Sequence, residues 1–114
     1  MAALVGEVAQ LLFAQKYADL AARFGYAVAL GREPVAAIRD DLNTCLAELG
    51  GSELQPDVPP EVQVTYFRPD GPLRAIAEGA LFNVSGARVL VEVVVSDARG
   101  ELHATLEQIS SAPS

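Results

Sequence analysis

Glu7 and Gln10 are the polar residues whose placement most suggests chemistry. On a helix of about 100° per residue, the next charged residues form one solvated stripe, made of Lys16, Asp19 and Arg23. Glu7 and Gln10 fall on the far side from it. A carboxylate off the solvated stripe is a candidate functional group, and Gln10 could orient a substrate carbonyl or a water molecule. The alternatives are an acid favoured by the helix dipole and a partly exposed amide.

His103 and Cys45 are the only histidine and the only cysteine. His103 shares a predicted strand face with Glu101 and Thr105, so we expect it to be exposed. Cys45 lies on an apolar helix stripe, where a small core residue is favoured over a nucleophile. One of each does not make a metal cluster, so we predict no metal site. We also predict no cofactor, because no phosphate loop or dinucleotide fingerprint is present.

Size and charge exclude several classes of protein. A chain of 114 residues forms a single domain, 1–114, and the 51% of apolar residues suggests a surface buried against a second copy. We therefore expect a homodimer.

A net charge of −7 argues against nucleic acid as a partner. The first 14 residues lack a basic start, so we predict neither a signal peptide nor a membrane span. The lone cysteine fits a reducing, cytoplasmic location.

The periodicity predicts an α+β fold, with helices first and a sheet afterwards. We expect helices at about 2–24 and 34–49, because apolar residues recur there at three- and four-residue spacing. A proline-rich loop follows. Period-2 apolar spacing bounded by Gly, Pro and Asp then predicts four antiparallel strands, at about 62–68, 73–84, 87–96 and 101–109. Two helices followed by a four-stranded meander indicate helices packed on one face of a sheet.

The strand half resembles hotdog-fold domains of the acyl-CoA thioesterase type. The matching segments are VQVTYFRP at 62–69, GPLRAIA at 71–77, GARVLVEVVV at 86–95 and DARGELHAT at 97–105. Thioesterases of this kind typically carry an aromatic residue before Arg-Pro, a strand of alternating alanines, a Val-Glu-Val strand and an Asp-x-x-Gly turn. The order and spacing of the segments carry the resemblance, which covers roughly the last 48 residues. Physically, Ala75, Ala77 and Gly79 leave room for a helix to lie close to the sheet.

The resemblance implies a sheet wrapped around one long central helix, with two copies paired edge to edge. Residues 2–9 are similar to the start of that helix, where the family carries an acid. Glu7 matches this acid, which would act as general base or nucleophile on an acyl thioester, with Gln10 as a helper. Under this resemblance the candidate substrate-binding residues are three aromatic residues and two arginines: Tyr17, Tyr66, Phe67, Arg68 and Arg88. The alternatives are an aromatic residue packed in the core and ordinary charges at strand edges and turns.

The first half of the chain departs from the family pattern. It has no strand before the first helix and no His-Gly-Gly-type loop, and it has an additional helix at about 34–49. Three interpretations of the fold stay open: a hotdog variant, a hotdog domain without catalysis, and an unrelated α+β domain. The favoured function is an acyl-thioester hydrolase or binding protein. The alternatives are a non-enzymatic domain that binds a small ligand and an acidic, inhibitor-type partner of a basic protein.

Overall fold

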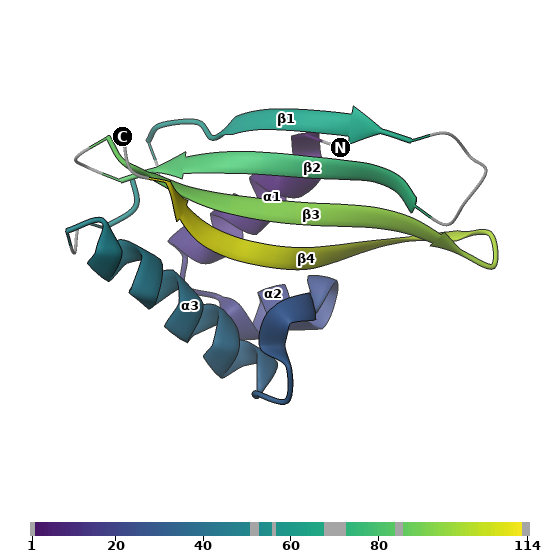
Figure 1. Cartoon of the computed structure of the whole chain (residues 1–114), viewed down its shortest axis with the longest axis horizontal. Helices are drawn as coiled ribbons and strands as arrows, with labels where there is room; N and C mark the ends of the chain where they lie inside the picture. The colour runs from purple at the N-terminus through teal and green to yellow at the C-terminus, as the bar shows by residue number, and fades with distance from the viewer. Residues whose placement is uncertain (1, 51–52, 56, 68–72, 84–85, 113–114) are drawn as a thin grey trace.

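A computed structural model describes residues 2–50, 53–55, 57–67, 73–83 and 86–112. Figure 1 shows helices on one side of a four-stranded sheet, in the predicted α+β arrangement. The helical elements are α1 (Ala2–Phe13), α2 (Tyr17–Phe24), the short 3₁₀ helix η1 (Ala27–Ala29) and α3 (Pro34–Glu48). The strands are β1 (Glu61–Tyr66), β2 (Leu73–Phe82), β3 (Arg88–Ala98) and β4 (Glu101–Ala112).

The predicted helix at 2–24 is wrong in one respect, because it is two helices. Gln15 has a φ of 57°, the left-handed conformation that ends many helices. The Lys16 N–H donates to the Leu11 carbonyl at 2.9 Å and the Gln15 N–H to the Leu12 carbonyl at 3.1 Å. These two bonds form a Schellman ending, which satisfies the last carbonyls of α1. The chain then folds back, so that Leu20 of α2 is fully buried.

Helix α3 confirms the second predicted helix. The Glu33 carboxylate caps its start, accepting from the Val35 and Ala36 N–H groups at 3.2 and 2.9 Å, and Pro34 occupies the first turn, where its missing N–H costs nothing. The helix buries a continuous stripe, formed by Ala37, Ile38, Leu42 and Cys45. This stripe packs toward β4, so that α3 lies along the edge of the sheet (Figure 1).

The four predicted strands are confirmed, in an antiparallel sheet of order β1-β2-β3-β4. The β3–β4 turn is built by Arg99 and Gly100, which both have positive φ, 55° and 85°. Such a two-residue turn matches the twist of the strands that it joins. The Asp97 carboxylate fixes the turn by accepting the Gly100 N–H at 2.8 Å. The predicted ends of the strands at 68 and 84 lie outside the described residues.

Small residues of β2 let α1 lie close against the sheet, as the sequence predicts. Gly79 faces α1, and a Cβ atom at this position would overlap the Cγ1 of Val5. Ala77 beside it is fully buried. The inward residues of β3 complete this layer of the core, namely Val89, Val91, Val93 and Val95. The core therefore lies between one face of the sheet and the helices, and the described helices leave the other face of the sheet uncovered.

Candidate functional site

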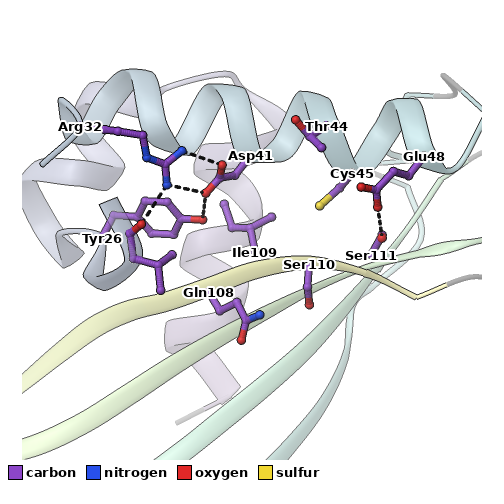
Figure 2. Close-up of a pocket in the computed structure, with 11 residues that line it drawn as sticks. Tyr26, Arg32, Asp41, Thr44, Cys45, Glu48, Gln108, Ile109, Ser110 and Ser111 are labelled. Atoms are coloured by element: carbon purple, nitrogen blue, oxygen red, sulfur yellow. Dashed lines mark hydrogen bonds and ion pairs between the residues drawn. The ribbon is translucent and has the colours of Figure 1, made fainter. Parts of the chain in front are cut away.

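A groove of about 480 Å³ runs between α3 and β4 (Figure 2). Its residues come from the η1 region, from α3 and from the end of β4: Tyr26, Val28, Arg32, Asp41, Thr44, Cys45, Glu48, Gln108, Ile109, Ser110 and Ser111. β4 is the last strand of the sheet order, so one side of its backbone faces this groove. The groove therefore combines polar side chains with the free edge of a strand.

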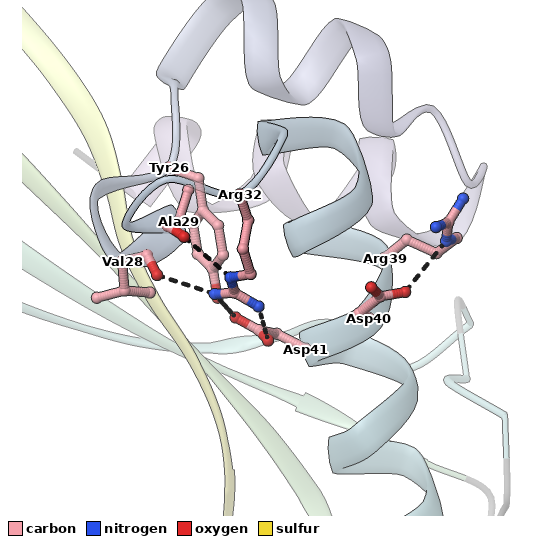
Figure 3. Close-up of polar contacts among 7 residues, drawn as sticks. All are labelled: Tyr26, Val28, Ala29, Arg32, Arg39, Asp40 and Asp41. Carbon is pink, nitrogen blue, oxygen red and sulfur yellow. Dashed lines mark hydrogen bonds and ion pairs between the residues drawn. The ribbon is translucent and has the colours of Figure 1, made fainter.

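Arg32 closes one end of the groove with a network of four side-chain hydrogen bonds (Figure 3). Its guanidinium binds Asp41 of α3 through two bonds, Nη1 to Oδ1 at 2.9 Å and Nη2 to Oδ2 at 3.2 Å. Nε and Nη2 also donate to the carbonyls of Ala29 and Val28, both at 2.9 Å. The hydrogen bonds from Arg32 lower the pKa of the Asp41 carboxyl. The network thus holds η1 against α3. Asp41 keeps its negative charge, which the positive charge of Arg32 compensates.

Tyr26 extends this network to the edge of the sheet. Its hydroxyl donates to Asp41 Oδ2 at 2.6 Å. Burial, followed by the hydrogen bond to Asp41, raises the pKa of Tyr26. The phenol therefore stays protonated at neutral pH. Tyr26 also lies near the backbone N–H of Ile109, at the edge of β4.

The other end of the groove carries Glu48 and Ser111. The Ser111 hydroxyl donates to Glu48 Oε2 at 2.6 Å. In an antiparallel ladder, backbone groups alternate between the partner strand and the free edge. Because the Ile109 N–H lies near Tyr26, we infer that the Ile109 carbonyl and the Ser111 N–H lie on the groove side of β4 as well. Figure 2 shows Gln108 and Ser110 pointing away from α3, so they contribute mainly backbone to this wall.

Cys45 lies at the centre of the groove, next to Ile109. Burial, then the charges of Glu48 and Asp41, raise the pKa of its thiol. It is therefore a protonated, inert side chain, as the sequence suggests for an apolar stripe. The pKa shifts of Tyr26, Asp41 and Cys45 all reinforce the ordinary protonation state. A general acid or base instead needs a pKa that is shifted toward neutrality. The three groups are therefore suited to binding a ligand.

Glu7 and Gln10 lie elsewhere. Glu7, on α1, forms an ion pair with Arg23 of α2, which the break at Gln15 brings back alongside α1. Its side chain is 29% exposed, and Gln10 is exposed. Neither residue lines the groove. The ion pair gives Glu7 a structural role, because it joins two helices that the sequence predicted as one.

Tyr17 lines a second, smaller cavity of about 220 Å³. The cavity lies between the α1–α2 turn, α3 and the segment before β1, and most of its residues are apolar: Leu12, Phe13, Gln15, Tyr17, Leu42, Asn43, Leu46, Glu53 and Leu54. Glu7 and Gln10 are not among them. Tyr17 therefore does not share this cavity with the predicted catalytic residues.

The remaining predicted residues lie on the sheet. Tyr66 ends β1 and is 71% exposed, and Phe67 follows it at 40%. Arg88 begins β3, on the sheet face opposite the helices. Arg68 lies outside the described residues. His103 is exposed, with Nε2 at 3.9 Å from Glu101 Oε2. The described residues of the predicted site are thus distributed over the molecule and do not form one cluster.

Sequence reasoning missed the groove residues Tyr26, Arg32, Asp41 and Glu48. Tyr26 and Arg32 lie between the two predicted helices, where no element was expected, and Asp41 and Glu48 lie within the helix predicted at 34–49 without a predicted partner. One signal was present, because Arg32 and Asp41 bracket the predicted start of α3 at Pro34. An arginine before a helix and an acid two turns inside it can meet only if the preceding segment folds back, and periodicity does not predict this.

No family model, curated protein or solved structure matches the chain. Among the described residues, no helix has both the length and the apolar character required to cross a bilayer. Within the same residues, no group of three His, Cys, Asp or Glu side chains is arranged to hold a metal ion. The groove and the residues around it are therefore the features of the chain that indicate a function.

Proposed function

We propose that this protein is a small-molecule-binding domain whose site is the groove between α3 and β4. The ligand carries a cationic or hydroxyl donor at one end and an apolar body. The observation that carries the proposal is the groove itself, in which the Glu48 carboxylate and the fixed polar network lie toward opposite ends, and the side chains of Cys45 and Ile109 also line it. Concave sites with a few placed polar groups are the usual form of small-ligand sites.

The charges of the groove favour a donor ligand. Asp41 is neutralised by Arg32, whereas the ion pairs among the described residues give Glu48 no cationic partner. Glu48 accepts one hydrogen bond, from Ser111, and a carboxylate has room for further donors. The Ile109 carbonyl is a second acceptor. A polyanionic ligand such as acyl-CoA would instead meet the charge of Glu48 and a chain of net charge −7.

The proposal predicts that Glu48→Gln weakens binding of a donor ligand. A library of small amines, polyols and amides is screened by calorimetry, and the best ligand is measured against wild type and variants. Loss of the charge is expected to weaken binding about tenfold or more, because hydrogen bonds to charged groups are worth about 1.5–3 kcal/mol. Glu53→Gln, at the smaller cavity, is the matched control and leaves the affinity unchanged. Equal effects of the two variants contradict the proposal.

A second candidate function, acyl-thioester binding or hydrolysis, is favoured by the mostly apolar cavity beside Tyr17. An acyl chain bound there would lie among the leucines of the cavity, namely Leu12, Leu42, Leu46 and Leu54. If Glu7 is the catalytic carboxylate, Glu7→Gln removes hydrolysis of a panel of acyl-CoAs, a loss on the order of a hundredfold or more. Circular dichroism checks that the variant folds. The ion pair with Arg23 predicts instead that Glu7→Gln mainly lowers stability.

Two further proposals concern the setting of the domain. The lone thiol of Cys45, buried and protonated, is compatible with a reducing, cytoplasmic compartment. A homodimer is proposed as well. The resemblance implies edge-to-edge pairing of two copies, and pairing at the β4 edge would have to displace α3 and η1, which pack against that strand.

A further inference from the structure

The outer face of the sheet, on the side opposite the helices, is apolar in two separate rows. Ile76 of β2 pairs with Val94 of β3 in one row, and Ala80 pairs with Leu90 in the other. No described helix packs on this side (Figure 1). Except at Glu92, the middle of β3 is apolar on both of its faces, which is the pattern of a strand buried on both sides. The pattern therefore predicts a partner for the outer face.

A row of glutamates and glutamines separates the two apolar rows. Glu78 and Glu92 lie directly opposite each other in the β2–β3 register, and Gln63 and Gln108 extend this glutamate row onto β1 and β4. Like charges directly opposite each other destabilise a sheet. None of the ion pairs among the described residues includes Glu78 or Glu92. The domain alone therefore retains a repulsion that a cation from a partner would relieve.

Two shallow hollows adjoin the glutamate row. The larger, of about 280 Å³, lies over β1, β2 and β3, and its charged residues are Glu61, Glu78 and Arg88. The smaller, of about 70 Å³, lies over β2, β3 and β4, and its charged residues are Glu78 and Glu92. Leu90 lines both hollows. Together they form a negatively charged depression that crosses the strands, with an apolar side chain at its centre.

We propose that the outer face binds an amphipathic helix of a basic partner protein, which lies across the strands along the glutamate row. Four strands spaced about 4.8 Å apart span about 14 Å, the length of about ten helical residues. A helix is about 10–12 Å wide with its side chains, and the apolar rows lie about 7 Å to either side of the glutamate row. One helix therefore contacts the carboxylates and both apolar rows.

The spacing of charges suits a helix with lysine or arginine on its contacting face. Residues four apart on a helix lie about 5–6 Å from each other, close to the distance between neighbouring strands. Two cations at this spacing can therefore meet Glu78 and Glu92, while apolar residues beside them contact Leu90 and Val94. Arg88, at the end of the larger hollow, is positioned to accept an acidic residue from the same helix and to fix its direction.

Charge complementarity also selects a basic partner over a second copy of this chain. A second copy that packed face to face along the glutamate row would place Glu78 and Glu92 of one chain against those of the other. A chain of net charge −7 attracts basic proteins during encounter and repels acidic ones. An apolar surface with charged residues among its contacts is typical of a protein–protein interface.

Calorimetry with a helical peptide tests the proposal. The probe is a peptide of roughly 20 residues, long enough to form a helix in water, with leucine and lysine on one face. At roughly 0.15 M salt, where charges more than about 8 Å apart are screened, Glu78→Gln and Glu92→Gln are each expected to weaken binding about tenfold, because each removes a charge-assisted hydrogen bond. Asp40→Asn, on the exposed side of α3, removes the same charge and leaves the affinity unchanged.

Two further measurements separate a specific interface from general attraction between charges. Val94→Thr keeps the charge and the shape of the side chain and is expected to weaken binding about threefold, because it replaces a buried methyl group with a hydroxyl. A peptide with glutamate in place of every lysine is expected not to bind. In the absence of peptide, Glu78→Gln is expected to raise the midpoint of urea unfolding, because it relieves the repulsion with Glu92, and this also shows that the variant folds.

Three outcomes would overturn the proposal. The first is a leucine–lysine peptide that does not bind, or that Asp40→Asn weakens as much as Glu78→Gln does. The second is a peptide whose binding is weakened by Glu48→Gln and not by Glu78→Gln, because it would then lie in the groove between α3 and β4. The third is a wild type that dimerises through this face, seen by sedimentation as a dimer that Val94→Thr weakens.

Discussion

At the scale of single residues, the Arg32–Asp41–Tyr26 network determines the shape of one end of the groove. Asp41 receives three hydrogen bonds, two from Arg32 and one from Tyr26. It therefore joins Arg32 and Tyr26, on either side of η1, to α3. In this position the Asp41 carboxylate stabilises the packing of its neighbours, and it also shapes one end of the proposed ligand site.

Asp41→Asn tests the network through the pH dependence of stability. The pKa of Asp41 is lowered in the folded state, so its contribution is present above the ordinary pKa of about 3.9 and is lost as the pH falls through the folded value. The variant is expected to lose about 1–2 kcal/mol of unfolding free energy at pH 7, because hydrogen bonds to a charged, partly exposed group are weakened. Below pH 4 its difference from wild type shrinks. Urea denaturation at several pH values measures this.

Asp40→Asn is the matched control for this measurement. Asp40 is the neighbouring residue, and its ion pair with Arg39 is more than half exposed on both sides. Its replacement is expected to change stability by only a few tenths of a kcal/mol at any pH. If Asp40→Asn and Asp41→Asn have the same effect at pH 7 and pH 3, the network does not hold the end of the groove.

Glu7 shows why the site was predicted less well than the fold. A helical wheel placed it from the assumption that residues 2–24 form one helix. The break at Gln15 changes the direction of α2, and Arg23, assigned to the opposite stripe, pairs with Glu7. Tertiary contacts determine whether and where a helix is interrupted in this way. The local residue types, Phe-Ala-Gln-Lys, favour a continuous helix and contain no glycine or proline to indicate a turn.

At the scale of elements, the sheet was predictable because its signal is local. Alternation in β2 and β3, and the Arg99-Gly100 turn, define strand positions and register without knowledge of the helices. The alternating small residues of β2 predicted that a helix lies close, and Gly79 confirms it. The periodicity of the strands does not predict that α3 packs beside β4. The groove depends on this packing.

Gly79→Ala tests the close approach of α1 to β2. The added Cβ overlaps Val5 Cγ1, and overpacking of this kind costs about 1–3 kcal/mol. Gly79→Ala/Val5→Ala is expected to be more stable than the sum of the two single changes, because the second removes the overlapping methyl group. Thermal unfolding measures all three variants.

Gly6→Ala provides the control on α1 itself. A Cβ at Gly6 meets nothing within 4 Å, so alanine is expected to stabilise the helix by about 0.5–1 kcal/mol. Equal effects at Gly6 and Gly79, or additive effects of Gly79→Ala and Val5→Ala, would contradict the packing described for α1.

At the scale of the whole molecule, the two faces of the sheet differ. The inner face carries the helices, and α3 packs along β4 at its edge, where the proposed ligand groove lies. The outer face is covered by none of the described helices (Figure 1).

The most direct test of the groove as the ligand site is nuclear magnetic resonance of the labelled domain, titrated with the best ligand from the screen. The proposal predicts chemical-shift changes concentrated at Thr44, Glu48 and Ser111, absent in Glu48→Gln. Changes concentrated instead around Tyr17 and Leu54, at the smaller cavity, or changes that Glu48→Gln leaves intact, would contradict it.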